Sequence, residues 1–216
     1  METMRTRATD LLPSVLLTVL SMVQALALEL LWTRIRESSY LWTWGWDALL
    51  GWSQVAAMLL GFLVVWLLFV SAVMRFRWLP AIQDSVVPFA IGILEFSLID
   101  LMGPGLLGPW LYTLALIFAV STWASQTIFR RARKDPANRE FFESVPPATL
   151  RDFVPSIGAI AGIGLLGLIL HVSGSQGWLA LAALLIAMAA LAHQIARTRQ
   201  YFERSLSNSD SSEAEA

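Results

Sequence analysis

The sequence predicts an all-α polytopic membrane protein: a bundle of six transmembrane helices with both the N-terminus and the C-terminus cytoplasmic. Composition is the first reason. A chain of 216 residues that is 56% hydrophobic and only 14% charged has too little polar surface to coat a soluble globule of its size. The other two reasons are the lengths of the apolar stretches and the one-sided placement of the basic residues.

Six apolar stretches are each close to the ~20 residues that a helix needs to cross a bilayer. The first is longer than the apolar part of a cleavable signal, so we expect it to remain in the mature protein. Together the stretches predict one transmembrane domain over residues 1–204, followed by a disordered, acidic and Ser-rich tail over 205–216. The predicted spans lie at about 11–32, 54–74, 86–103, 107–128, 154–172 and 178–196.

The basic residues predict the orientation, because positively charged loops are retained on the cytoplasmic side. With the N-terminus inside, the outer segments contain only Arg34 and Arg36 of the 15 Lys and Arg residues. Lys134 is the single lysine, and this bias toward arginine favours a bacterial inner membrane as the location.

Helical spacing predicts which faces of the spans pack against protein. On the first span, small and polar residues form one stripe that we expect to face the bundle. On the fifth, Gly158 and Gly162 form a G-x-x-x-G step that lets a neighbouring backbone approach closely, either in the hairpin with the sixth span or in a homo-oligomer. The stripe of the first span consists of Ser14, Thr18, Ser21, Ala25, Glu29 and Arg36.

Two carboxyl groups interrupt the third apolar stretch, in "AIGILEFSLIDLMGPG" at 90–105. Glu95 lies ~14 Å from Val86 along a helix and therefore near the middle of the membrane, and Asp100 lies in the outer half. A charge at that depth is costly, so such groups face a cavity or a partner, or stay protonated. We predict that Glu95 is a proton-binding or ion-binding residue, whereas Asp100 either joins it or hydrogen-bonds the broken backbone at Gly103 and Pro104.

The outer half of the membrane contains further polar residues that are candidates for the same site. Glu29 lies about one turn below the outer end of the first span, and His171 lies at the outer end of the fifth. With Asp100 they are candidates for an outward-facing ligand-binding or ion-binding cluster above Glu95. Alternatively, Glu29 pairs with an arginine near the headgroups, and His171 is a hydrogen-bonded interface residue.

A second polar set occupies the inner half of the fourth and sixth spans. Hydroxyl and amide groups in membrane helices usually bond across helices or back to their own backbone. The functional alternative is a polar path from Glu95 toward the cytoplasm. The set consists of Ser121, Thr122, Ser125, Gln126, His193 and Gln194.

Tryptophans are concentrated in the outer loop "SSYLWTWGWDALLGW". Trp42, Trp44 and Trp46 alternate, so an extended chain would present all three on one side. They are explained either by the aromatic belt at the membrane interface or by an aromatic lid that stacks on a flat or cationic solute over the polar cluster.

Several chemistries are excluded or disfavoured. The chain has no cysteine, which excludes disulfides and thiolate ligands. His171 and His193 lie too far apart in depth to bind one haem iron, and no P-loop or H-E-x-x-H motif is present. We therefore expect no catalytic residues, no metal site, no cofactor and no nucleic-acid partner, and do not expect an enzyme.

Three functions of different classes remain, and the third, a lipid-modifying enzyme, is disfavoured because no convergent set of acids, histidines and bases lies at one membrane level. In the first, the protein binds or translocates a small solute, a cation or a proton through a site around the midplane carboxylate Glu95. In the second, it is a non-catalytic membrane scaffold or a subunit of a larger membrane complex, whose intramembrane acids pair with another chain. Besides the lipid bilayer, the expected partners are accordingly a small-molecule or cation ligand, a second copy of the chain, or a membrane partner subunit.

Overall fold

The computed structural model describes residues 4–75, 82–143, 150–174 and 177–214, and the regular elements in these ranges are all helices. The long helices are joined by short links that contain one-turn 3-10 helices and one short α-helix. In chain order the elements are α1 (Met4–Glu37), η1 (Ser39–Trp42), α2 (Trp46–Arg75), η2 (Ile82–Ser85), α3 (Val86–Asp100), α4 (Leu107–Ala132), η3 (Pro136–Asn138), α5 (Arg139–Glu143), α6 (Leu150–Ser173) and α7 (Trp178–Ala214).

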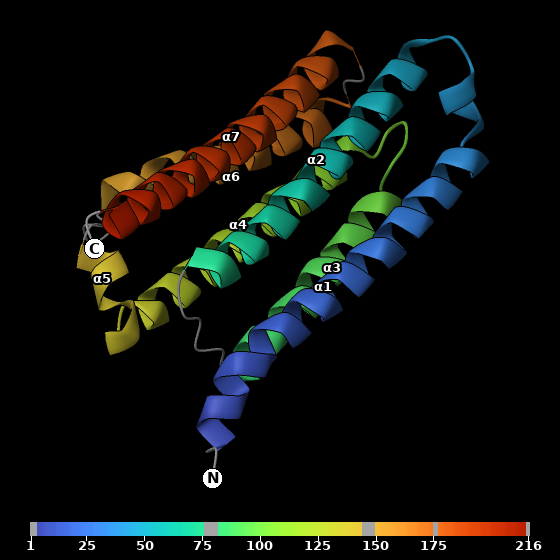
Figure 1. The fold of residues 1–216 in the computed structure, drawn as a ribbon. Helices are drawn as coiled ribbons and strands as arrows, with labels where there is room; N and C mark the ends of the chain where they lie inside the picture. The colour runs from blue at the N-terminus through green and yellow to red at the C-terminus, as the bar shows by residue number, and fades with distance from the viewer. Residues whose placement is uncertain (1–3, 76–81, 144–149, 175–176, 215–216) are drawn as a thin grey trace.

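The six longer helices form a closed ring. Each packs against its two neighbours in the order α1, α3, α4, α6, α7, α2 and back to α1, while α2 also contacts α4 across the middle. Figure 1 shows α3 beside α1, and the start of α1 and the end of α7 at the same end of the bundle. Helices next to each other in sequence are therefore not always the closest partners in space.

Five of these helices are long and apolar enough to cross a membrane: α1, α2, α4, α6 and α7. The third expected span is present as α3, but it ends at Asp100 and has only 15 residues, about 22 Å of helix. Gly103 (φ 145°) and Gly105 (φ 82°) lie in the turn that follows, a backbone conformation that favours glycine and ends the helix. The expected count of six full spans is thus not confirmed.

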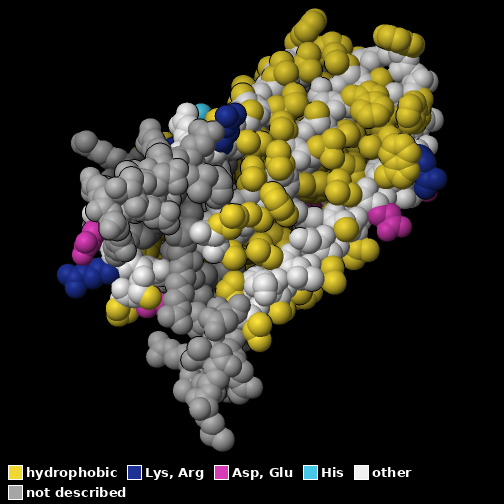
Figure 2. Space-filling model, in the orientation of Figure 1, with side chains coloured by type: hydrophobic (Ala, Val, Ile, Leu, Met, Phe, Trp, Pro, Cys, Tyr) yellow, Lys and Arg dark blue, Asp and Glu magenta, His cyan; other side chains and the backbone are white. Residues whose placement is uncertain are grey.

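The surface of the bundle supports the membrane assignment. In each of the five spans, at least half of the most apolar stretch remains unburied, and Figure 2 shows hydrophobic side chains covering most of the visible helical face. A water-exposed patch of this extent is rare on a soluble monomer. The architecture is that of a multi-pass membrane protein, while the orientation and the bacterial inner membrane stay predictions.

The predicted inward face of α1 is wrong. Ser14, Thr18, Ser21, Ala25 and Glu29 are all exposed, and the buried face consists of other residues. Two of the hydroxyls bond to their own helix, Ser14 to the carbonyl of Leu11 and Thr18 to that of Ser14, which satisfies them without a neighbour. The face that packs inward contains Leu16, Leu20, Gln24, Ala27, Leu31 and Ile35.

The glycines of α6 also pack differently from the expectation. Gly158 and Gly162 have no neighbouring atom within contact distance of an added Cβ, so the G-x-x-x-G step mediates no packing within the described chain. The close approach occurs instead at Gly167, where a Cβ would lie 3.0 Å from the carbonyl oxygen of Gly108 on α4. The fully buried alanines of α7 are Ala180, Ala183 and Ala187, and α7 packs mainly along α2 rather than along α6.

An ion pair connects two elements near the α4 C-terminus. Arg131 donates from Nη1 to both carboxylate oxygens of Asp84, each at 2.8 Å. Asp84 belongs to η2, so this pair connects the start of the α3 segment to the end of α4. Helix α7 continues through Ala214 and so extends into the acidic, Ser-rich segment 205–216. The disorder of that segment in solution stays a prediction.

Candidate functional site

Glu95 is the most deeply buried carboxyl group in the described chain, with 1% of its surface exposed. It lies on the inner face of α3, beside Gln24 of α1. The Gln24 Nε2 donates to Glu95 Oε1 at 3.4 Å and to the backbone carbonyl of Phe62 on α2 at 2.9 Å. One amide thus connects the three helices α1, α2 and α3.

A glycine explains why α1 comes close enough to place this amide. Gly92 lies one turn before Glu95, and a Cβ at that position would collide with the side chain of Val23. The contact brings Val23 and Gln24 of α1 to the level of Gly92 and Glu95 of α3. Helices of membrane proteins use small residues in this way to approach closely.

The second carboxyl oxygen of Glu95 has no hydrogen-bond partner in the described chain, and none of the ion pairs found there involves Glu95. A buried polar atom without a partner is costly. The free oxygen therefore marks a place where a proton, a water molecule or a cation would complete the site.

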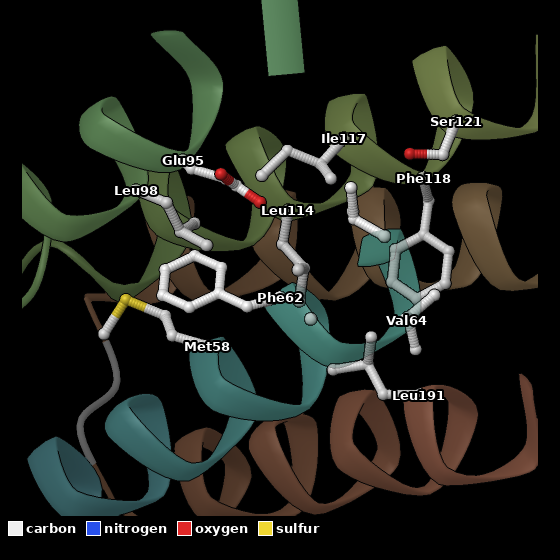
Figure 3. Close-up of a pocket in the computed structure, with 12 residues that line it drawn as sticks. Met58, Phe62, Val64, Glu95, Leu98, Leu114, Ile117, Phe118, Ser121 and Leu191 are labelled. Atoms are coloured by element: carbon white, nitrogen blue, oxygen red, sulfur yellow. The ribbon is translucent and has the colours of Figure 1, made fainter. Parts of the chain in front are cut away.

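A cavity of about 30 Å³ lies beside Glu95 and is lined by residues of α2, α3, α4 and α7. Figure 3 shows the carboxyl group of Glu95 at one side and the hydroxyl of Ser121 at the other, each directed toward the space between them. Ser121 is 8% exposed, and its Oγ is likewise without a hydrogen-bond partner. The walls between the two are mostly apolar and include Phe62, Leu114, Ile117 and Phe118.

The other predicted site residues do not join Glu95. Glu29 and Asp100 are exposed, whereas Glu95 is enclosed. His171 packs its backbone and Cβ against Gly108, and its ring makes an edge contact with Tyr112, with centroids 6.4 Å apart. The structure therefore does not gather Glu29, Asp100 and His171 into one enclosed cluster with Glu95.

The three alternating tryptophans diverge, because the outer segment is not extended: η1 contains Trp42, and α2 already begins at Trp46. Trp42 donates its indole N–H to the Ile35 carbonyl at 3.1 Å. Trp46 makes an edge contact with Trp178 of α7 at 4.9 Å between centroids, and Trp44 is fully exposed. These positions match an aromatic belt better than a single stacking lid.

The turn between α3 and α4 is held by residues that the sequence did not single out for it. Arg34 of α1 donates from Nη2 to the Met102 carbonyl at 3.2 Å, and Gln54 of α2 accepts from the Gly103 N–H at 3.3 Å. Tyr40 lies beside the same turn; burial raises the pKa of its phenol, and Ser38 and Arg34 oppose the rise. These polar contacts hold the turn that follows α3 against α1 and α2.

Sequence reasoning identified Glu95 and included Ser121 in the inner polar set, but missed Gln24. The available signal was the position of Gln24 in an otherwise apolar run, where an amide needs a partner. Within the described residues, no group of three or more His, Asp or Glu side chains is arranged to bind a metal ion. Compared with known proteins, the chain matches no family model, no curated relative and no solved structure.

Proposed function

We propose that this integral membrane protein is a transport protein in which Glu95 takes up and releases a proton or small cation. One observation carries the proposal: a carboxyl group 1% exposed has one oxygen hydrogen-bonded to Gln24 and the other unpartnered. Neither of the two ion pairs found among the described residues involves Glu95. A proton or cation from outside the chain would neutralise this carboxylate.

The energetic argument favours a binding role over a purely structural one. An ionised carboxylate in hydrocarbon costs several kcal/mol, and such residues occur mainly where substrates, ions or protons pass. A residue that only tied α1 to α3 would not need an acid, since an amide at position 95 would accept the same hydrogen bond from Gln24. The carboxyl group adds the ability to change its protonation or bind a cation.

The size of the cavity limits what Glu95 binds. A space of about 30 Å³ accommodates about two or three water molecules, since one water needs roughly 10–15 Å³. A drug-sized organic solute occupies several hundred Å³. Transport of a larger solute at this position would need α2 and α4 to separate.

Transport in proteoliposomes tests the proposal. The protein is reconstituted with a pH-sensitive dye inside, a potassium diffusion potential is applied, and the proton flux is compared with that of Glu95→Gln. Glu95→Gln keeps the acceptor for Gln24 and should abolish the flux, while Glu29→Gln, which changes an exposed carboxyl on α1, should leave it unchanged. Sodium and potassium fluxes are measured in parallel under gradients of each ion. The proposal is overturned if neither the proton flux nor the flux of either cation differs between Glu95→Gln and the unchanged protein.

A second candidate function is a subunit or scaffold of a larger membrane complex. The exposed stripe on α1 favours it, because Ser14, Thr18, Ser21 and Ala25 give a small, weakly polar face and Glu29 a carboxyl group on the surface. Such a face suits a helix with a hydroxyl or basic residue. Native mass spectrometry after gentle extraction separates the two: a stoichiometric second protein that is lost on Ser21→Leu would support this candidate.

A further inference from the structure

We propose that the species exchanged at Glu95 is a proton carried by water, and that it reaches Glu95 from one side only. That side is the end of the bundle where α4 ends and Lys134 lies, and the route is the cavity that ends at Ser121. The inference rests on the proposed role of Glu95. It adds the cargo, the direction of access and a second residue of the site.

The cavity extends further from Glu95 along α4 than it does toward the turn at 101–106, where Met58 and Leu98 also line it. Leu114 and Ser121 both line it, and seven residues of helix separate them by ~10 Å along the axis. Ser121 is the nearer of the two to the C-terminal end of α4, which is followed by Arg133 and Lys134. The space beside Glu95 therefore points toward the basic end of the bundle.

The opposite direction is packed. The layer between Glu95 and the turn at 101–106 contains large side chains, each 2% exposed or less. Beyond this layer, the hydrogen bonds from Arg34 to Met102 and from Gly103 to Gln54 hold the turn in place. A second cavity of about 10 Å³ lies beside this turn, lined in part by Gln54 and Gly103, and it shares no lining residue with the cavity at Glu95. The packed residues are Leu98, Ile99, Met102, Trp110 and Leu111.

Two unpartnered oxygens delimit the route. Ser121 Oγ and Glu95 Oε2 lack hydrogen-bond partners, and the two side chains point toward each other across the cavity (Figure 3). Ser125, one turn further, already donates its hydroxyl to the Ser121 carbonyl at 2.8 Å, so Ser121 is the last free hydroxyl before the apolar part of the cavity. Water entering from the basic end would find an acceptor and donor at Ser121 and a proton acceptor at Glu95.

The apolar walls explain why such a route transmits protons without being an open pore. Ile117, Phe118 and Phe62 lie between the two polar ends, and an apolar constriction of this size is dry most of the time and gates by wetting. When water bridges it, a hydronium ion gives one proton to Glu95 Oε2. The O–H bond formed on the carboxyl replaces the one broken on hydronium, and a neutral water molecule remains.

The shape and composition of the site argue against a metal cation as the cargo. Hard cations bind six or more oxygen ligands in the best-characterised protein sites, whereas the side chains around this cavity include one free carboxyl oxygen, that of Glu95, and one free hydroxyl, that of Ser121. A proton needs only one acceptor.

Single-cysteine accessibility tests the route, because the chain contains no cysteine of its own. Ser121→Cys places a thiol of nearly the same size at the inner end of the cavity. Ala124→Cys is the matched control: it lies one turn away on α4, is 2% exposed, and does not line the cavity. The probe is the silver ion, which is close to water in size, added to sealed vesicles of each orientation.

The side of addition is assigned by the single lysine. Lys134 is exposed, so a membrane-impermeant amine reagent labels it in vesicles whose basic end faces outward. Because the reaction requires an accessible thiolate, we expect the thiol at 121 to react about tenfold faster than the thiol at 124. We expect this faster reaction only in vesicles whose Lys134 faces outward. Equal rates at the two positions, no reaction at either, or faster reaction from the opposite side would each overturn the route.

The outcome is independent of the transport assay. The accessibility of the thiol at 121 requires no flux, so it can be measured also in the Glu95→Gln background. If proton flux depends on Glu95 but the thiol does not react from the Lys134 side, the route is wrong and the proposed function stands. If the thiol reacts as expected but flux is independent of Glu95, the water-accessible cavity is real and the proposed function is wrong.

Discussion

The hydrogen bond between Gln24 and Glu95 leads to the most quantitative prediction. Gln24→Met keeps the volume and removes both donated bonds, at 2.9 Å to Phe62 and 3.4 Å to Glu95. Hydrogen bonds inside membrane proteins contribute ~0.6 kcal/mol on average, so we expect Gln24→Met to lower the free energy of unfolding by about 1 kcal/mol, with an added cost for the two acceptors left unpaired.

A double-mutant cycle isolates the part that belongs to Glu95. The single variants Gln24→Met and Glu95→Met and the double variant are unfolded reversibly by SDS in mixed micelles, and the coupling free energy is computed from the three differences. We expect a coupling of ~0.6 kcal/mol if the carboxyl is neutral, because the bond is then an ordinary amide–carbonyl bond. A value of roughly 1.5–3 kcal/mol would indicate an ionised acceptor.

The control for this cycle is the other buried glutamine. Gln54 is 2% exposed and bonds to the Gly103 backbone rather than to Glu95. Gln54→Met combined with Glu95→Met should therefore be additive within ~0.3–0.5 kcal/mol, as for independent sites. A coupling between Gln24 and Glu95 that is no larger than this control would refute the interaction and with it the anchoring of the carboxyl to α1.

Two further predictions concern the packing that holds the site. Gly92→Val should separate α1 from α3, because even a Cβ at position 92 collides with Val23. Overpacking of this kind typically lowers the free energy of unfolding by ~1–3 kcal/mol, which the same SDS titration measures. An unchanged unfolding midpoint would contradict the close approach of the two helices. Asp84→Asn should destabilise the basic end by leaving the partly buried Arg131 guanidinium without its carboxylate, a loss visible in thermal unfolding. Glu143→Gln changes an ion pair whose side chains are 82% and 65% exposed, so it should have almost no effect; equal losses in the two variants would contradict the difference in burial.

The location of Glu95 was predictable and its partner was not. A single acid in the middle of an apolar run already indicates a buried functional group. Its partner Gln24 lies 71 positions earlier in the chain, and no local pattern connects the two. The contact depends on α1 and α3 lying side by side, although α2 separates them in sequence.

The wrong inward face of α1 has a physical reason. Helical spacing places Ser14, Glu29 and the small residues between them on one stripe, and the cost of polar groups in lipid predicts that this stripe faces the interior. Ser14 and Thr18 instead bond to carbonyls of their own helix, which lowers the cost of exposing them. Burial on α1 follows large apolar residues such as Leu20 and Leu31, so packing area outweighed the polarity of small hydroxyl residues.

By itself, the amino-acid sequence determined the class of the protein: an all-helical membrane chain, the approximate positions of its long apolar helices, and one acid that hydrocarbon does not tolerate unpaired. These properties follow from composition, segment length and the cost of charge in lipid, all of which are local. Only the tertiary structure decided the order of helices in the ring, the length of α3, and the neighbours of Glu95. Those depend on which apolar surfaces fit together, and nearly uniform Leu-rich faces do not encode that choice in any short stretch of chain.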